Sequence, residues 1–301
     1  MAEPVLEGRP GPMPFFLLLD EAMRRTRPHL RAVLPSVALP VALLTTLLSS
    51  LQMLNARQSL AQVDVVASLM SSLEVLVGSL LVGILTGVAY SAAQVAALDA
   101  LMGRPVDMRR AWRFVLQARV WSALLLVGLA LFVSAIACIV PVLYVAPLLS
   151  LVMPVMVVEE VFGVAALSRS AELTRFNPSR RLGESPILKV LLLMVASTLI
   201  AYLAALPVDL PFQLPVMIDI LRRLVAGNLD TQALVSRWIW LQVPAVFLGS
   251  LVRTAVYLYT AFGIGMLFFD VRGRKEGTDL REEIDALFPA PPVPPSGAPW
   301  P

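Results

Sequence analysis

Five long stretches without a charged residue limit what this 301-residue chain can fold into. They lie between positions 31 and 57, 74 and 99, 119 and 159, 189 and 209, and 237 and 270, and only Arg253 interrupts one of them. A membrane-spanning helix needs about 20 apolar residues to cross a hydrocarbon core about 30 Å thick. Each stretch is therefore long enough for a span, and its continuous apolar sequence is unlike the alternating strands of a spanning β-barrel.

The stretch between Arg119 and Glu159 holds 39 residues, which would reach nearly 60 Å as one helix at about 1.5 Å per residue. Pro141 near its middle predicts a turn between two spans. The sequence thus predicts an all-α polytopic membrane protein with six transmembrane helices, at about 32–55, 70–100, 119–139, 142–159, 187–208 and 243–269. We expect disorder in residues 1–14 and in the proline-rich tail 286–301, on either side of a single domain at 15–285.

The composition agrees, because 58% of the residues are hydrophobic and 15% are charged, against roughly 45–50% and 25% in soluble domains. One cysteine and one histidine exclude an intramolecular disulfide and the usual zinc sites. We expect Cys138 to have a packing role. No phosphate-binding loop or dinucleotide-binding turn is found, and the pair Glu159–Glu160 lacks the later histidine of an intramembrane metalloprotease. We therefore expect no enzyme activity, no metal and no cofactor.

Lysines and arginines are divided unequally between the two sides of the predicted topology. Nineteen of the 24 fall in segments that share one side, at 9–31, 104–119, 169–189 and 272–281. Four fall on the other side, at 57, 222, 223 and 237. Cytoplasmic segments carry the excess of positive charge in membrane proteins, so both termini are expected in the cytoplasm. The basic pI of 9.3 then reflects a membrane topology, and we expect no nucleic-acid partner.

Three segments on the basic side have the pattern of amphipathic helices that lie in the membrane interface. Residues 15–27, 106–117 and 161–175 each place apolar residues on one helical face and arginines on another. In the second segment, Arg109, Arg110 and Arg113 are candidate contacts for lipid headgroups. Each basic residue near the surface adds about 1 kcal/mol of attraction to anionic lipid. The expected partners are therefore anionic membrane lipids, with a protein partner or a second copy as further options.

Two segments at helix ends carry a resemblance to a known family. One is EEV at 159–161 with AALSRSAELTR at 165–175, and the other is YLY at 257–259 with FFDVR at 268–272 and RKEGTDL at 274–280. They resemble the six-helix domain found alone in bacterial membrane proteins and as the membrane-embedded part of some glycerophosphodiester phosphodiesterases. The resemblance implies a six-helix fold in a bacterial inner membrane. It implies no phosphodiesterase activity, because that chemistry belongs to a separate soluble domain with paired histidines, and this chain has only His29.

Arg253 is the charged residue that stands out, because it lies within the sixth predicted span. It is nine residues from Pro244, about 13 Å along a helix, which predicts a position near the middle of the membrane. A charge at that depth normally faces the bundle interior or a water-filled cavity. It could bind an anion or a lipid headgroup, or it could pair with a carboxylate inside the protein. Glu74 is the first candidate partner, and Gln94 is the other polar residue at depth.

Small residues at four-residue spacing mark one face of the second span. The residues are Ser79, Gly83, Gly87 and Ser91. Such a stripe lets another helix approach closely. We expect it to pack inside the bundle, with dimerisation as the alternative.

Two functions fit these features. The first is a non-enzymatic membrane module that binds or organises lipids or partner proteins. The second is a transporter or export component with Arg253 near its substrate path. Pro35, Pro40 and Pro154 would favour a transporter, because many transporters bind substrate at interrupted helices. The scarcity of polar residues at depth favours the first function.

Overall fold

The computed structural model describes residues 14–59, 65–137, 139–175, 185–226 and 231–287. These residues form helices and turns without a strand, so the predicted all-α class is confirmed. The expectations for residues 1–13, for Cys138 and for the tail after Leu287 lie outside the described residues. The longer helices are α2 (Leu30–Ser59), α3 (Val65–Leu101), α5 (Ala118–Ala137), α6 (Ile139–Leu149), α9 (Pro186–Val225) and α10 (Thr231–Leu287). The shorter ones are α1 (Phe15–Thr26), the 3₁₀ turn η1 (Arg27–His29), α4 (Met108–Val115), α7 (Val152–Pro154), the π turn η2 (Val155–Glu159) and α8 (Val164–Thr174).

Six helical segments of the described chain are long and apolar enough to cross a membrane. They are Phe15–Leu54, Leu76–Leu101, Ala118–Ile136, Pro141–Glu159, Pro186–Val225 and Trp240–Lys275. Each overlaps one predicted span, so the expected number of spans is confirmed. The chain is a multi-pass membrane protein.

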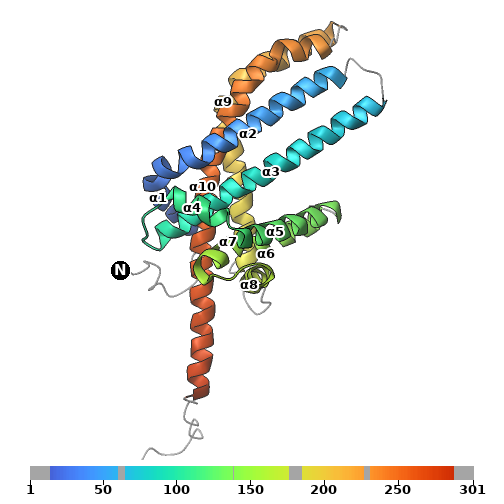
Figure 1. The fold of residues 1–301 in the computed structure, drawn as a ribbon. Coiled ribbons are helices and arrows are strands. Elements are labelled where there is room, and N and C mark those ends of the chain that lie inside the picture. The colour runs from blue at the N-terminus through green and yellow to red at the C-terminus, as the bar shows by residue number, and fades with distance from the viewer. Residues whose placement is uncertain (1–13, 60–64, 138, 176–184, 227–230, 288–301) are drawn as a thin grey trace, which may run out of the picture.

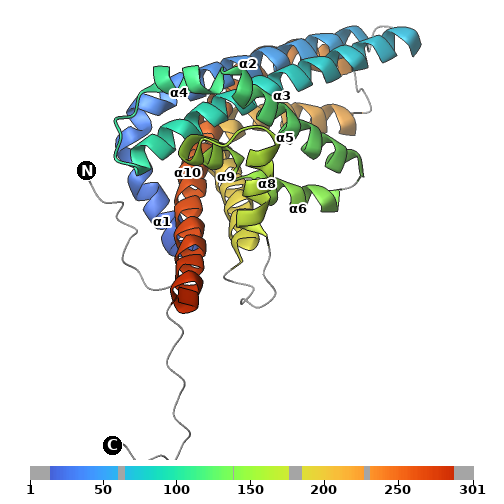
Figure 2. The same cartoon turned by 60° about the horizontal axis from the view of Figure 1, so that its bottom comes forward.

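The last helix, α10, is the centre of the bundle. It packs along α9, α2 and α3, and α1 and α8 also contact it. Figures 1 and 2 show the other long helices arranged around α10, with α1 alongside it. The pair α5 and α6 contacts the bundle through α8 and α9. A central position explains why the sixth span has the largest buried share of the six candidates.

The tightly packed core occupies only part of the length of the helices. One cluster joins α1, α3, α4, α5 and α8 to α10, with Phe268 and Leu267 fully buried. A second cluster joins the start of α2 to the end of α3 around Val37 and Ala96. The far halves of the helices expose their leucines instead, as at Leu47 and Leu80. A hydrocarbon phase would cover such surfaces, because lipid tails are as apolar as leucine.

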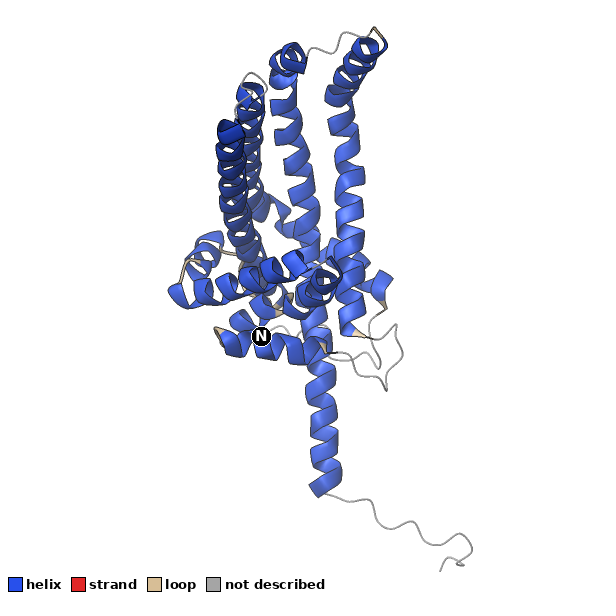
Figure 3. Cartoon of the chain, turned by 90° about the vertical axis from the view of Figure 1, so that its right-hand side faces the viewer, coloured by secondary structure: helices blue, strands red, loops and turns tan. Residues whose placement is uncertain are grey.

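The short helices gather at the packed end. Figures 1 and 3 show α1, α4 and α8 together at one end of the bundle, while the tips of α2 and α9 lie at the other end. α1 turns away from α2 at η1, which contains Pro28. The segments that the charge pattern assigns to one side of a membrane therefore do lie on one side of the protein.

The fourth span is interrupted, and the turn before it is not at Pro141. α5 ends at Ala137 and α6 begins at Ile139, so Pro141 lies in the first turn of α6, where its missing N–H is tolerated. α6 stops at Leu149, and α7 and η2 continue the span to Glu159. Pro154 has no N–H to donate to the carbonyl of Ser150, which explains why the α-helix is interrupted there.

The fifth span is longer than predicted. The sequence indicates an end near residue 208 followed by a long connection, but α9 continues as one helix to Val225. Pro207, Pro211 and Pro215 lie within it at four-residue spacing. Each proline frees the carbonyl four residues earlier, and these groups share one face, so the helix bends instead of ending. Figure 1 shows that the far part of α9, at the top of the view, is curved.

Candidate functional site

Arg253 of α10 forms an ion pair with Asp209 of α9. Its Nη2 donates a hydrogen bond to Asp209 Oδ2. The guanidinium carbon also lies 5.3 Å from the centre of the Tyr202 ring, within the range of a cation–π contact. Arg253 Nε is buried and has no acceptor among the described residues. The pair is therefore electrically neutral, but the guanidinium keeps donors that Asp209 does not use.

A glycine makes room for this pair. A Cβ atom at Gly249 would collide with the carboxylate of Asp209 and would lie 3.4 Å from Arg253 Nη2. Gly249 is one turn before Arg253 on α10, so the absence of a side chain there lets Asp209 approach the helix surface.

The structure changes the expected partner of Arg253. The first candidate was Glu74 on α3, but the carboxylate beside Arg253 is that of Asp209, which ends the fourth uncharged stretch. The side chain of Glu74 lies outside the described residues. Gln94 is half-buried on α3, and no hydrogen bond joins it to the pair within the described chain.

A second ion pair joins the same two helices toward the packed end. Lys189 Nζ of α9 lies 3.8 Å from Asp270 Oδ2 of α10, and Lys189 is almost fully buried. Arg253 and Asp270 are 17 positions apart, and Lys189 and Asp209 are 20 apart, which correspond to about 26 and 30 Å of helix. This interval matches a hydrocarbon core about 30 Å thick. It places Arg253 near one end of the apolar interval, whereas counting from Pro244 indicated the middle.

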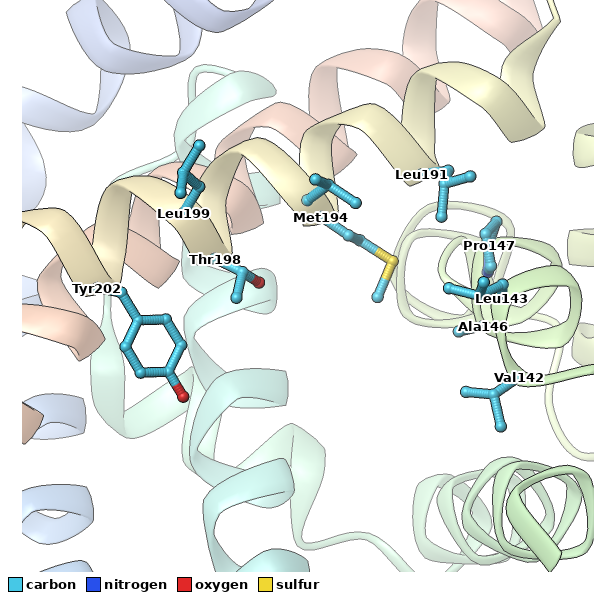
Figure 4. A pocket seen from close by; sticks show the side chains of 10 residues that line it. Val142, Leu143, Ala146, Pro147, Leu191, Met194, Thr198, Leu199 and Tyr202 are labelled. Carbon is cyan, nitrogen blue, oxygen red and sulfur yellow. The ribbon is translucent and has the colours of Figure 1, made fainter. Parts of the chain in front are cut away.

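An apolar groove of about 600 Å³ lies between α6 and α9. On α6 it is lined by Val142, Leu143, Ala146 and Pro147. On α9 the lining follows one helical face from Leu191 to Tyr202. Figure 4 shows these α9 side chains in a row, with Tyr202 at the opposite end from Leu191. The groove therefore ends at the ring that contacts Arg253.

The three arginines of α4 have different surroundings. α4 buries Ala111 and Val115 and packs Trp112 against the core, while Arg109 and Arg113 are exposed. Arg110 is exposed as well, but its Nη1 lies 3.4 Å from Oδ1 of Asp99. Arg109 and Arg113 are thus the arginines of α4 without an ion pair among the described residues.

Asp99 was not singled out by the sequence, but it is fully buried at the end of α3. Arg104, which lies between α3 and α4 in the sequence, is 3.9 Å from its carboxylate. Gly103, with φ of 70°, ends α3, and Arg104 N–H donates to the carbonyl of Asp99 at 2.8 Å. Neither carboxylate oxygen accepts a hydrogen bond within the described residues, so Arg110 and Arg104 supply the charge compensation.

The segment AALSRSAELTR connects several elements at the packed end. Arg169 of α8 donates to Glu159 at 3.0 Å, and Arg272 of α10 lies 3.8 Å from the same carboxylate. The hydrogen bond to Glu159 raises the pKa of Arg169 above its usual value. Lys275 of α10 donates to the carbonyl of Glu172 at 2.8 Å. These links hold α8 against the end of α10.

The same segment also contacts the fourth span at the point where its helix is interrupted. Buried Ser170 donates to the carbonyl of Leu148 at 2.6 Å, and Thr174 Oγ1 lies 3.4 Å from the same oxygen. A carbonyl in the last turn of a helix needs such a partner. The interruption is therefore closed by α8 and does not offer this carbonyl to a ligand.

The stripe of small residues on α3 lies inside the bundle only in part, because Ser91 is buried but the two glycines are not. Gly83 and Gly87 are exposed, and a Cβ atom on either would meet nothing within 4 Å. Ser79 accepts a hydrogen bond from Gln52 of α2 at 3.1 Å, and Ser91 donates to its own helix at Gly87. The stripe thus reaches a neighbour at Ser79, and its two glycines lie in open space.

The close helix contacts are made by glycines of α10 instead. A Cβ at Gly263 would lie 2.9 Å from Leu193 of α9, and one at Gly265 would lie 2.8 Å from Leu101 of α3. Both glycines lie in the central helix. Their close contacts depend on which helices surround α10, and the spacing of small residues in the sequence does not reveal that arrangement.

The sequence reasoning missed Asp209, Asp99 and Tyr202. The signal for the two carboxylates was present, because each ends an uncharged stretch and so lies where a span meets a polar region. Tyr202 had no such signal within its apolar stretch. Searches of protein families, of curated proteins and of solved structures found no match to this chain.

Proposed function

We propose that the protein is a non-enzymatic module of the bacterial inner membrane that binds anionic lipid at the basic end of its bundle, with both termini in the cytoplasm. The observation that carries the proposal is the placement of α4. Its apolar face is fixed on the core, and Arg109 and Arg113 point outward. Fixed cations at a membrane surface attract anionic headgroups at about 1 kcal/mol each.

The other short helices support the same surface. α1 and α8 lie at the same end as α4 (Figure 1). Many of their charges are engaged within the protein, since Glu21 pairs with Arg24 and Arg25, and Arg169 pairs with Glu159. The outward arginines of α4 are therefore the part of this end best suited to lipid. The resemblance to stand-alone six-helix domains is consistent with a role that needs no catalytic residues.

The test compares two variants of the same helix in detergent solution. Arg109→Gln with Arg113→Gln should weaken binding of phosphatidylglycerol about thirtyfold, which corresponds to about 2 kcal/mol for two cations. Native mass spectrometry during lipid titration measures the binding. Arg110→Gln is the matched control, because Arg110 faces Asp99, so it should lower thermal stability and leave the binding largely unchanged. Equal lipid binding by the double variant and the original protein would refute the proposal.

The second candidate is a transporter or export component with Arg253 near its substrate path. The interrupted fourth span favours it, because discontinuous helices form substrate sites in many transporters. Two contacts argue against it: Ser170 occupies the Leu148 carbonyl at the interruption, and Asp209 neutralises Arg253. Uptake of small anions into proteoliposomes that depends on Arg253 would favour the transporter.

A further inference from the structure

The groove between α6 and α9 leads toward the Arg253–Asp209 pair. Asp209 lies seven positions after Tyr202, two helical turns along the same face of α9. Leu191, Thr198 and Tyr202 line the groove on that face. The apolar groove therefore ends at Tyr202, whose ring contacts the guanidinium of Arg253.

The dimensions and chemistry of the groove suit an acyl chain. Leu191 and Tyr202 are 11 positions apart, so the groove follows about 16 Å of α9, close to half of a hydrocarbon core about 30 Å thick. Its volume of about 600 Å³ lies within the range of ligand pockets in proteins. Apart from Thr198 and Tyr202, its lining side chains are apolar. A single chain can thus lie along the groove without burying an unpaired polar group.

The end of the groove near Arg253 suits a phosphate. Arg253 gives its Nη2 to Asp209, and its Nε has no acceptor among the described residues. Guanidinium groups bind phosphate through several parallel N–H donors. Because the pair with Asp209 is neutral, recognition here depends on hydrogen bonds to the phosphate more than on its net charge.

We propose that this groove binds one membrane phospholipid, with an acyl chain between α6 and α9 and the phosphate at Arg253 and Tyr202. This site is separate from the basic surface of α4, and its lipid is held singly in a defined orientation. A variant can therefore lose lipid binding at one of these two sites and keep it at the other.

The chain part of the site is tested by filling the groove. Leu199→Trp places a bulky ring in the lining, whereas Leu203→Trp places it one turn along α9 at a similarly exposed position outside the lining. Each purified variant is titrated with phosphatidylglycerol and examined by native mass spectrometry for a lipid that survives collisional activation. Leu199→Trp should lower retention about tenfold or more, because it displaces the buried chain, and Leu203→Trp should leave it unchanged. Equal retention by the two variants would overturn the proposal.

The phosphate part is tested with a ligand of the same chains. Diacylglycerol lacks the phosphate, so the unmodified protein should retain it less than phosphatidylglycerol. Asp209→Asn should strengthen retention of phosphatidylglycerol, because it removes the negative charge that competes with the phosphate for Arg253. Equal retention of the two lipids, or weaker phosphatidylglycerol retention in a stable Asp209→Asn variant, would refute the placement of the phosphate at Arg253 and Tyr202. Loss of lipid in the α4 double variant with the groove lipid retained would separate this site from the proposed function.

Discussion

At the scale of single residues, charges within and at the ends of the apolar stretches form pairs between neighbouring helices. Arg253 with Asp209 and Lys189 with Asp270 join α9 to α10 at two levels. A charge left alone in a low-dielectric region is costly, and a partner on the next helix offsets that cost. These pairs therefore fix the register of α9 on α10, since sliding one helix by a turn would separate both.

Removing Arg253 should destabilise the protein by about 3 kcal/mol, because Asp209 would remain without its counter-charge. Arg253→Leu is compared with Asp209→Leu and with the double variant by thermal unfolding in detergent. The double variant should be more stable than the sum of the single changes predicts. Glu74→Gln in the Arg253→Leu background should give no rescue. Additive effects at 253 and 209, or rescue by Glu74→Gln, would contradict the observed pairing.

Glycines on α10 and α3 should respond differently to a methyl group. Gly249→Ala should lower stability, because its Cβ would collide with the Asp209 carboxylate and displace it from Arg253. Gly87→Ala has open space around it and should be neutral or stabilising by up to about 1 kcal/mol, since alanine favours helix more than glycine does. Unfolding curves of the two variants decide this. A loss at Gly87 comparable to that at Gly249 would show that the α3 stripe also makes a close contact.

At the scale of elements, prolines have opposite consequences in two spans. In the fourth span Pro154 coincides with an interruption, and α8 supplies the missing hydrogen bonds through Ser170 and Thr174. In α9 three prolines bend a helix that remains continuous. The difference follows from what surrounds each segment. In an apolar environment, the backbone N–H and C=O groups freed by an interrupted helix need nearby polar partners.

The contact between α8 and the interrupted span predicts a specific loss on removing one hydroxyl. Ser170→Ala should cost about 1–3 kcal/mol, because a buried carbonyl would lose its shortest hydrogen bond. Ser168→Ala is the control, since Ser168 is on the same helix but exposed. The melting temperature should fall for the first variant only. Equal melting temperatures would mean that Thr174 alone satisfies the Leu148 carbonyl.

At the scale of the whole molecule, the packing is concentrated at one end. α1, α4 and α8 cover that end, and their buried faces join a single core cluster with α10. Toward the other end the leucines of α2, α3 and α5 are exposed. A membrane makes this arrangement stable, because lipid covers apolar helix surfaces that water would penalise.

The charge pattern predicts a single orientation of this bundle. Reporter fusions after residues 105, 180 and 285 should show a cytoplasmic location, and fusions after residues 60 and 230 should show the opposite side, because the arginine-rich segments remain on the cytoplasmic side. Paired alkaline phosphatase and fluorescent-protein reporters measure the two locations. One reversed position would invalidate the assigned topology.

The number and approximate position of the spans could be predicted from the sequence alone. That information is local: a run of about 20 apolar residues satisfies the length of a hydrocarbon core whatever its neighbours are. The amphipathic pattern of α4 is local in the same way, and the helix buries Ala111 and Val115 while Arg109 and Arg113 are exposed. The predicted ends of the helices were less accurate. The effect of Pro141, Pro154 and Pro207 on a helix depends on which hydrogen-bond partners surround the backbone at each position.

The partners of these elements were decided by the tertiary structure. Glu74 and Asp209 are both carboxylates at the ends of uncharged stretches, and the packing of α9 on α10 brings Asp209 to Arg253. The same packing selects Gly249 and Gly263 for close contacts and leaves Gly83 and Gly87 in open space. A pair energy depends on distance and burial, and neither can be obtained from sequence spacing when the two residues belong to different helices.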